Sequence, residues 1–381
     1  MINKTLQNNK NNEIIYIMLY FNGITLYKKT NIKLKNNTKK VLIIRLSSMG
    51  DVVLTTPLVR CIRNKYHNSI IEFVVDKRFS DVIKYNPHIN DIIEYDRNDA
   101  NYNKKIKEKL DTDYTIIDLQ NNRRSKLFRS GLGKVIGVFD KYRLKKLSLV
   151  YLKKNYFNNI TIPERYINTA SVLDIRNDNK GLEVWLPEEN NAKIYKPENK
   201  IYSNVPNKIT IVPSATHYTK RWLPDYFIEL INMIYDKYAS NFNLIGSNND
   251  KEICKYIASK LRNKINIVDY SGKTSILEAT HIIDKSDLMI TNDTGLMHIA
   301  AARQVPIVAL YGSTVRDLGF APYKAKNTIC EVELKCRPCS HIGRKQCSKK
   351  HFNCMTLLSP DIVFNKMESL ISNLYKTKKH K

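Results

Sequence analysis

Residues 287–313 combine a short polar loop and a histidine in a spacing that could bind phosphate. They read DLMITNDTGLMHIAAARQVPIVALYGS, a pattern typical of a buried strand, a polar loop, a helix and a second strand. Asp293, Thr294 and Gly295 would stand at the start of the helix, where free backbone N–H groups and the positive end of the helix dipole favour an anion. His298 lies one turn further along the same side and could donate a hydrogen bond to a leaving phosphate, although a helix histidine satisfied locally is the commoner case. The segment therefore predicts a site for a phosphate-bearing ligand.

A second loop of this kind, PSATHYTKRW, spans residues 213–222 between an expected strand and an expected helix. Thr216 and Lys220 fall where a phosphate could be held. The lysine ammonium is a flexible point charge, which suits a diphosphate. The alternative is a solvated loop in which Lys220 and Arg221 face water.

A third candidate is Asp51, which ends the run RLSSMGD at residues 45–51. Gly50 permits a tight turn and the close approach of a ligand. Asp51 would follow the turn that contains Ser48 and stand at the start of a helix. It could act as a general base on an acceptor hydroxyl. It could also serve only as a helix cap, and this segment by itself favours the cap.

The elements around these loops predict where they lie. Apolar runs typical of buried strands alternate with amphipathic helices, which predicts parallel sheets joined by right-handed crossovers. In such sheets ligands bind at the carboxyl ends of strands, where all three loops fall. Beyond residues 287–313, the expected strands are residues 41–46, 69–76, 89–95, 114–119, 134–138, 208–213, 242–246 and 266–269, and the clearest helices are 163–173, 224–238, 251–261 and 275–286.

The polar, proline-bearing stretch of residues 186–207 lacks helix or strand periodicity, so it marks a boundary between two α/β domains. We expect a basic N-terminal extension over residues 1–38 and a first domain over 39–190. A second domain would cover 208–365, followed by a basic tail at 366–381.

Basic residues are in excess, with 63 Lys and Arg against 36 Asp and Glu and a formal net charge of +27. Residues 1–40 carry eight Lys against one Glu, and residues 335–381 carry eleven Lys and Arg against two acidic residues. The rest of the chain is only mildly basic for its length. The basic ends could adhere to an anionic membrane surface, or they could reflect a general bias towards Lys, Asn, Ile and Tyr. No nucleic-acid recognition element is recognisable, so no nucleic-acid partner is expected.

The longest apolar candidate, IIYIMLYFNGITLY at residues 14–27, is interrupted by Asn22 and Gly23. It is shorter than the roughly 20 residues that a bilayer requires. No small-residue cleavage site follows it, which argues against a signal peptide. We expect a cytoplasmic protein whose N-terminal appendage could lie on the inner membrane as a peripheral contact.

Four late cysteines have a spacing that could hold zinc through thiolates. They are Cys336, Cys339, Cys347 and Cys354. The second pair lacks the tight spacing of specific zinc motifs, and the alternative is a set of reduced, partly buried thiols. Disulfides would be unexpected in the cytosol. No metal or other cofactor is expected.

Together these segments resemble glycosyltransferase family 9, the ADP-heptose:lipopolysaccharide heptosyltransferases. The segments that carry the resemblance occur in family order over residues 39–360 and are RLSSMGDVVLTTPLVRCIRNKY, YTIIDLQNNRRSKLFRSGLGKVIG, PSATHYTKRW, LIGSNND and TNDTGLMHIAAARQVPIVALYGST. The resemblance implies a GT-B architecture, in which two Rossmann-like domains with parallel sheets face a central cleft. The first domain would hold the acceptor and the second the nucleotide sugar. The cysteine-rich tail also looks like a family feature, which weakens the zinc interpretation.

The resemblance also implies roles for individual residues. Asp51 would be the catalytic base, and Lys220 would contact the donor diphosphate and assist its departure. The other residues implied on the donor side are Thr216, Asp250, Asp293, Thr294, Gly295 and His298, and those on the acceptor side are Ser48, Gly50 and Arg123. Asp250 would contact the nucleoside, although the preceding Asn248 and Asn249 depart from the more usual acidic or glycine-rich pattern.

The expected reaction is a metal-independent, inverting transfer of a heptose or related sugar from an ADP-sugar to a lipopolysaccharide core acceptor. The expected partners are a nucleotide sugar such as ADP-heptose, a lipopolysaccharide core or related glycolipid, and an anionic membrane surface. The basic extension and the high Lys and Asn content depart from the family and leave the donor and acceptor open. The alternative function is a basic nucleic-acid- or membrane-surface-binding protein with a cysteine-bound zinc and no transferase activity.

Overall fold

The computed structural model describes residues 3–8, 13–20, 23–30, 40–187, 194–195 and 205–376 of the chain. Packing divides the chain into two units, Met1–Lys39 and Lys40–Lys381, and each is described by itself. Most of the expected boundary segment and the last five residues of the expected tail lie outside the described residues.

The first unit is a three-stranded antiparallel sheet. Its strands are β1 (Asn3–Asn8), β2 (Glu13–Tyr20) and β3 (Gly23–Thr30). The apolar run considered above as a membrane-surface segment falls in β2 and β3, which pair along their whole length. Among the helices of the described residues, none is both long enough and apolar enough to cross a membrane.

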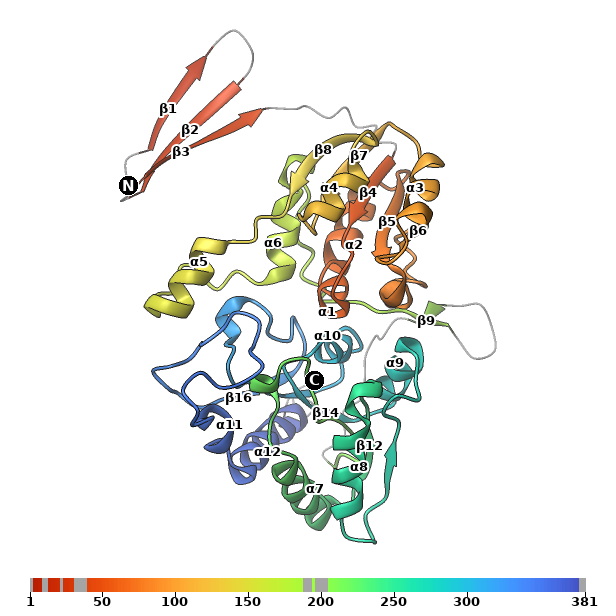
Figure 1. Cartoon of the computed structure of the whole chain (residues 1–381), viewed down its shortest axis with the longest axis vertical. Coiled ribbons are helices and arrows are strands. Elements are labelled where there is room, and N and C mark those ends of the chain that lie inside the picture. Colours follow the sequence, from red (N-terminus) through yellow and green to blue (C-terminus); the bar gives the residue numbers. More distant parts are fainter. Residues whose placement is uncertain are drawn as a thin grey trace. The chain divides into compact units, whose positions relative to one another are not determined.

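The second unit contains two parallel sheets, visible in Figure 1. The first has the strand order β6-β5-β4-β7-β8. Its strands are β4 (Lys40–Ile44), β5 (Ile70–Asp76), β6 (Asp91–Tyr95), β7 (Tyr114–Asp118) and β8 (Gly133–Val138). In the central strand β4 the four apolar residues after Lys40 are fully buried, because helices cover both faces of a parallel sheet.

The helices of this half of the unit are short. They are α1 (Met49–Val53), α2 (Thr56–Lys65), α3 (Ala100–Glu108), α4 (Arg123–Arg129), α5 (Arg143–Leu147) and α6 (Ile162–Thr169). The 3-10 turns η1 (Lys77–Val82) and η3 (Ser171–Leu173) and the π-helical turn η2 (Ser148–Leu152) complete the set. A short ribbon of β9 (Leu186–Pro187) and β10 (Ile194–Tyr195) follows.

The second sheet has six parallel strands in the order β13-β12-β11-β14-β15-β16. They are β11 (Lys208–Val212), β12 (Asn241–Leu244), β13 (Ile267–Asp269), β14 (Leu288–Asn292), β15 (Ile307–Leu310) and β16 (Asn327–Cys330). Its helices are α7 (Pro224–Tyr238), α8 (Lys251–Lys260), α9 (Ile276–Asp284), α10 (Gly295–Ala302), α11 (Asn353–Thr356) and α12 (Pro360–Lys376), with 3-10 turns η4 (Tyr218–Lys220), η5 (Asn248–Asp250) and η6 (Arg316–Leu318). The predicted α/β class with two Rossmann-like parallel sheets is confirmed.

Helix α12 extends the packed part of the second sheet beyond residue 365, where the sequence analysis ended that domain. Val363, Met367, Leu370 and Leu374 are buried in the same core as the apolar side of α7. Their spacing of three or four residues places them on one face of the helix. The packed part of the second half therefore continues to Leu374, within helix α12.

The order of the strands predicts where a ligand binds. In each sheet the chain first adds strands on one side of its first strand and then crosses to the other side. This reversal lies between β4 and β7 in the first sheet and between β11 and β14 in the second. Ligands of open parallel sheets bind at the carboxyl ends of strands at such switch points. The three candidate loops follow β4, β11 and β14, so all of them lie at a switch point.

Candidate active site

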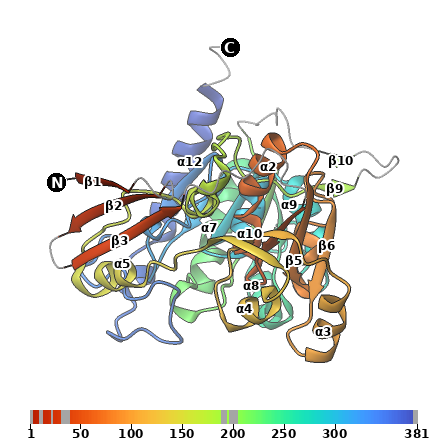
Figure 2. The ribbon, with the colours of Figure 1, turned by 90° about the horizontal axis from the view of Figure 1, so that it is seen from above.

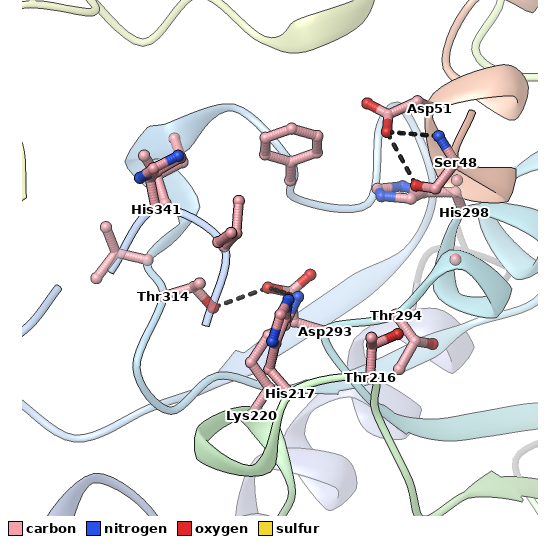
Figure 3. Close-up of a pocket in the computed structure, with 16 residues that line it drawn as sticks. Ser48, Asp51, Thr216, His217, Lys220, Asp293, Thr294, His298, Thr314 and His341 are labelled. Atoms are coloured by element: carbon pink, nitrogen blue, oxygen red, sulfur yellow. Dashed lines mark hydrogen bonds and ion pairs between the residues drawn. The ribbon is translucent and has the colours of Figure 1, made fainter. Parts of the chain in front are cut away.

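A cavity of about 360 Å³ opens where these loops meet, and its size is within the range of small-molecule sites. Figure 3 shows Asp51 and Ser48 on one side of it and Thr216, Lys220 and Asp293 on the other. The lining residues are Ser48, Gly50, Asp51, Thr216, His217, Lys220, Asp293, Thr294, Gly295, His298, Thr314, Val315, Leu318, Phe320, His341 and Ile342. The structure therefore brings together every residue expected at the site except Asp250 and Arg123.

Two glycines bring the two halves of the cavity into contact. Helix α1 packs against α10, and a Cβ added at Gly50 would lie 2.9 Å from Cδ2 of His298 and 3.1 Å from Cα of Gly295. A Cβ added at Gly295 would lie 3.1 Å from the backbone nitrogen of Gly50. Real Cβ atoms rarely tolerate such distances, so only glycine lets the two strand-to-helix turns approach this closely.

Three neighbours hold the carboxylate of Asp51. Arg45 Nη2 lies 2.8 Å from its Oδ1, and the Tyr166 hydroxyl donates to the same oxygen over 3.3 Å. The backbone N–H and the hydroxyl of Ser48 donate to Oδ2 over 3.1 and 3.0 Å. Asp51 does make the capping contact that its sequence position suggested. Its side chain nevertheless lines the cavity, so capping does not exclude a role towards a ligand.

This network sets the charge of the carboxylate. Burial raises the pKa of Asp51, but the positive charge of Arg45 and the hydrogen bonds from Ser48 outweigh burial, so the pKa lies below its ordinary value. Burial raises the pKa of the Tyr166 hydroxyl, which stays protonated and remains a donor. Asp51 is therefore an ionised proton acceptor at neutral pH.

Lys220 forms an ion pair on the opposite wall. Its Nζ lies 2.7 Å from Oδ2 of Asp293, and the Thr314 hydroxyl donates to the same oxygen over 2.8 Å. The two charged side chains are only 15% and 9% exposed, so solvent screens the pair weakly. Lys220 is thus held at the cavity wall by a carboxylate.

His298, one turn into α10, is buried beside this pair. Burial lowers its pKa to about 4, against the opposing effect of the charges of Asp293 and Asp51. Its Nδ1 is buried and has no hydrogen-bond partner in the structure. The ring is therefore neutral at physiological pH, and its Nδ1 is enclosed by protein atoms.

The loop that carries Lys220 is fixed by contacts from distant parts of the chain. The backbone N–H of Trp222 donates to the side-chain oxygen of Asn292 over 3.0 Å, and the Trp222 ring N–H donates to the carbonyl of Leu358 over 2.8 Å. The backbone N–H of Thr219 donates to the carbonyl of Arg344 over 3.1 Å, in the cysteine-rich segment. That segment, residues 335–354, therefore supports the loop after β11.

Asp250 and Arg123 lie elsewhere. The Asp250 carboxylate accepts bonds from the backbone and hydroxyl of Ser247, so it caps the turn after β12, one strand beyond β11. Arg123 begins α4 and lines a separate hollow, whose other lining residues are Asn121, Asn122, Lys126, Leu127, Ser130, Lys141 and Arg143. The structure therefore places these two residues outside the cavity that Asp51 and Lys220 line, and their expected roles remain predictions.

The late cysteines are free thiols. Burial raises the pKa of the Cys339 thiol, and it raises that of Cys354 to about 12. Within the residues that the structure describes, no group of three or more His, Cys, Asp or Glu side chains is arranged to hold a metal ion. The zinc interpretation thus receives no support here.

The sequence analysis missed several residues that shape the cavity. Thr314 follows β15 and could have been found, because it stands at the carboxyl end of a strand like the other loops. Tyr166 and His341 carry no such signal, since each reaches the site through a contact between distant segments. His217 lies inside the quoted PSATHYTKRW loop but was not singled out.

The low pKa of His298 predicts how stability depends on pH. Between its ordinary pKa of 6.5 and about 4 the unfolded chain binds a proton that the folded chain does not. The free energy of unfolding should therefore fall by about 3 kcal/mol from this group as the pH drops through that window. Denaturant unfolding of the wild type and His298→Gln from pH 7 to 4 measures this, and the variant should lose that part of the slope. Two parallel curves, separated by a constant offset, would contradict the assignment.

Comparison with known proteins agrees with this geometry. Residues 103–352 match the family model of glycosyltransferase family 9 (heptosyltransferase). The chain is 31% identical over 163 residues to lipooligosaccharide heptosyltransferase 2 of Campylobacter jejuni, covering 40% of this chain and 47% of that relative. The match thus spans about half the length of that relative. With lipopolysaccharide heptosyltransferase 2 of Escherichia coli K12 it is 26% identical over 298 residues, covering 73% of this chain and 84% of the relative.

Solved structures share the fold. The glycosyl transferase family 9 protein from Veillonella parvula superposes with a TM-score of 0.70 at 21% identity, covering 88% of this chain and 98% of that one. The E. coli heptosyltransferase WaaC with ADP gives a TM-score of 0.64 at 19% identity, covering 87% and 99%. Two parallel sheets that meet at a cavity, together with a family match over more than half of its length, establish that the chain belongs to glycosyltransferase family 9.

Proposed function

We propose that the protein is a glycosyltransferase that transfers a heptose from ADP-heptose to a lipopolysaccharide core acceptor, with inversion and without a metal. Family membership supports the reaction class, and the names of the relatives, including a heptosyltransferase studied with ADP, support the donor and acceptor. In this assignment residues 39–190 hold the acceptor and residues 208–365 the donor. The observation that carries the proposal is that an ionised carboxylate and a lysine face one cavity from opposite walls.

The donor diphosphate would lie between Lys220 and the start of α10. The first N–H groups of a helix have no acceptor within the helix and favour a phosphate. His298 lines the same wall as a neutral ring, so it adds no charge beside the diphosphate. Lys220 would interact with both Asp293 and the diphosphate, and it would stabilise the negative charge that develops on the diphosphate as the bond to the sugar breaks.

Asp51 would take the proton from the acceptor hydroxyl. The hydroxyl oxygen bonds to the anomeric carbon as the bond to the diphosphate oxygen breaks, and the proton passes to the Asp51 carboxylate. A base and a leaving-group site on opposite walls suit a single displacement with inversion. The low pKa of Asp51 makes it a weak base, but glycosyl transfer passes through an oxocarbenium-like state in which the attacking hydroxyl becomes strongly acidic. A weak, fully ionised base is therefore sufficient late in the reaction.

The first test concerns Asp51. Asp51→Asn keeps the size of the side chain but cannot accept the proton, so kcat should fall by about 10²- to 10⁴-fold. Affinity for ADP, measured by calorimetry, should be unchanged because the residue lies on the opposite wall. Asp361→Asn, an exposed acidic residue on α12, is the matched control and should keep wild-type turnover. Near-normal turnover of Asp51→Asn would remove this residue from the mechanism.

The second test concerns the charge that Arg45 imposes on Asp51. In Arg45→Met the burial of Asp51 is no longer opposed by that charge, so the pKa of Asp51 should rise. The acid limb of kcat/KM should then move to higher pH than in the wild type, whereas Arg45→Lys should keep the limb near its original position. Rates from pH 5 to 8 measure this shift. An unchanged acid limb in Arg45→Met would mean that Asp51 does not titrate in the reaction.

The third test separates ligand binding by Lys220 from its structural role. Lys220→Met leaves Asp293 buried and unpaired, which should cost about 3–5 kcal/mol of stability and weaken ADP binding. The double variant Lys220→Met/Asp293→Asn removes the unpaired charge, so its melting temperature should recover while its affinity for ADP stays low. Recovery of ADP affinity in the double variant would show that Lys220 only neutralises Asp293.

A further inference from the structure

A short helical segment outside the cavity exposes large apolar side chains to solvent. Helix α5 continues into the π-helical turn η2, and along this stretch Leu144 is 82% exposed, Tyr151 is 68% exposed and Leu152 is 67% exposed. Leu147 is half exposed. Residues 144, 147 and 151 are spaced three and four apart, which places them on one side of a helix. We call residues 141–157 the α5 segment.

The α5 segment is also strongly basic. It reads KYRLKKLSLVYLKKNYF and contains six Lys and Arg residues and no acidic residue. The modest net charge of the middle of the chain therefore includes one strongly basic segment. Basic side chains alternate with exposed leucine and tyrosine side chains along the same short stretch.

The segment is held firmly by its inner face. Leu149 and Phe157 are buried together with Leu318 of η6. Lys153 Nζ donates to the carbonyls of Cys336 and Pro338 over 3.1 and 2.8 Å. The exposed leucines therefore belong to a fixed element with one packed and one unpacked side.

This composition identifies the surface that would cover the unpacked side. The cores of protein–protein interfaces are depleted in lysine, whereas an apolar stripe bordered by lysines is typical of elements that lie in the interface of an anionic membrane. Apolar side chains enter the acyl boundary there, lysines reach the phosphates, and tyrosine favours the interface. We propose that the α5 segment docks the protein on an anionic phospholipid bilayer. This inference goes beyond the proposed transfer reaction and does not depend on it.

The α5 segment lies close to the cavity, so docking would affect where the cavity is held. In both views α5 lies at the periphery of the second unit (Figures 1 and 2). Leu318, against which the segment packs, also lines the cavity between the sheets. Docking through the exposed leucines would therefore hold the cavity close to the lipid surface.

The test measures binding of the full chain to vesicles of phosphatidylcholine, with and without phosphatidylglycerol, by co-sedimentation. The wild type should prefer the anionic vesicles. Leu144→Ser/Leu147→Ser/Leu152→Ser should bind roughly tenfold more weakly or worse, since it removes the apolar contact. The matched control Val268→Ser/Leu357→Ser/Ile362→Ser changes exposed apolar residues of the other half and should bind like the wild type.

A second pair of variants tests the charge and leaves the exposed leucines in place. Lys145→Gln/Lys154→Gln should weaken binding about fivefold per charge, which corresponds to about 1 kcal/mol for each basic residue at the surface. Lys104→Gln/Lys105→Gln, on exposed positions of α3, should have no such effect. Melting temperatures equal to that of the wild type verify folding.

Three outcomes would overturn the proposal. Wild-type binding by both α5-segment variants would mean that other basic parts of the chain hold the lipid. Equal binding to neutral and anionic vesicles would remove the charge argument. A wild-type dimer in sedimentation velocity that becomes monomeric in the leucine variant, without vesicle binding, would make the stripe a contact between copies of the chain.

Discussion

The contact between Gly50 and Gly295 is the constraint on which the rest of the site depends. Each glycine stands at the start of a helix that follows a central strand, and each lacks the Cβ that would push the other helix away. Their approach fixes the neighbouring residues. Asp51 follows one glycine and Thr294 precedes the other, so both must face the same cavity. The backbone thus sets the distance between a proton acceptor and a helix N-terminus before any side chain is considered.

Electrostatics then assigns a charge state to each group around that contact. Asp51 is kept ionised by Arg45, and His298 is kept neutral by burial. Lys220 lies on the wall opposite Asp51, paired with Asp293. A negative group, a neutral imidazole and a positive group therefore line a space of about 360 Å³. Such preorganisation is what transition-state stabilisation requires, because no group has to be reoriented as charge moves.

Local patterns in the sequence were sufficient to predict the two sheets and most of the expected residues that line the cavity. Helix α7 has the predicted bounds, since Pro224 starts it and the apolar periodicity ends at Tyr238. The loops after β11 and β14 lie together because neighbouring parallel strands place their carboxyl ends at one edge of a sheet. The loop after β4 belongs to the other sheet and meets them through the contact of α1 with α10. Tyr166 could not be predicted, because its contact with Asp51 joins segments 115 residues apart. The position of Asp250 outside the cavity could not be predicted either, because the sequence does not reveal that β12 lies one strand farther out than β11. The α5 segment was not predicted as a surface feature, because the sequence alone does not show that its leucines are exposed and not part of the core.

The most direct measurement of the central claim is a crystal structure of the protein with ADP bound. We expect a diphosphate within hydrogen-bonding distance of Lys220 Nζ and of the first backbone N–H groups of α10, with Asp51 across the remaining space. A diphosphate bound in the hollow beside Arg123, or one that leaves Lys220 paired only with Asp293, would contradict it.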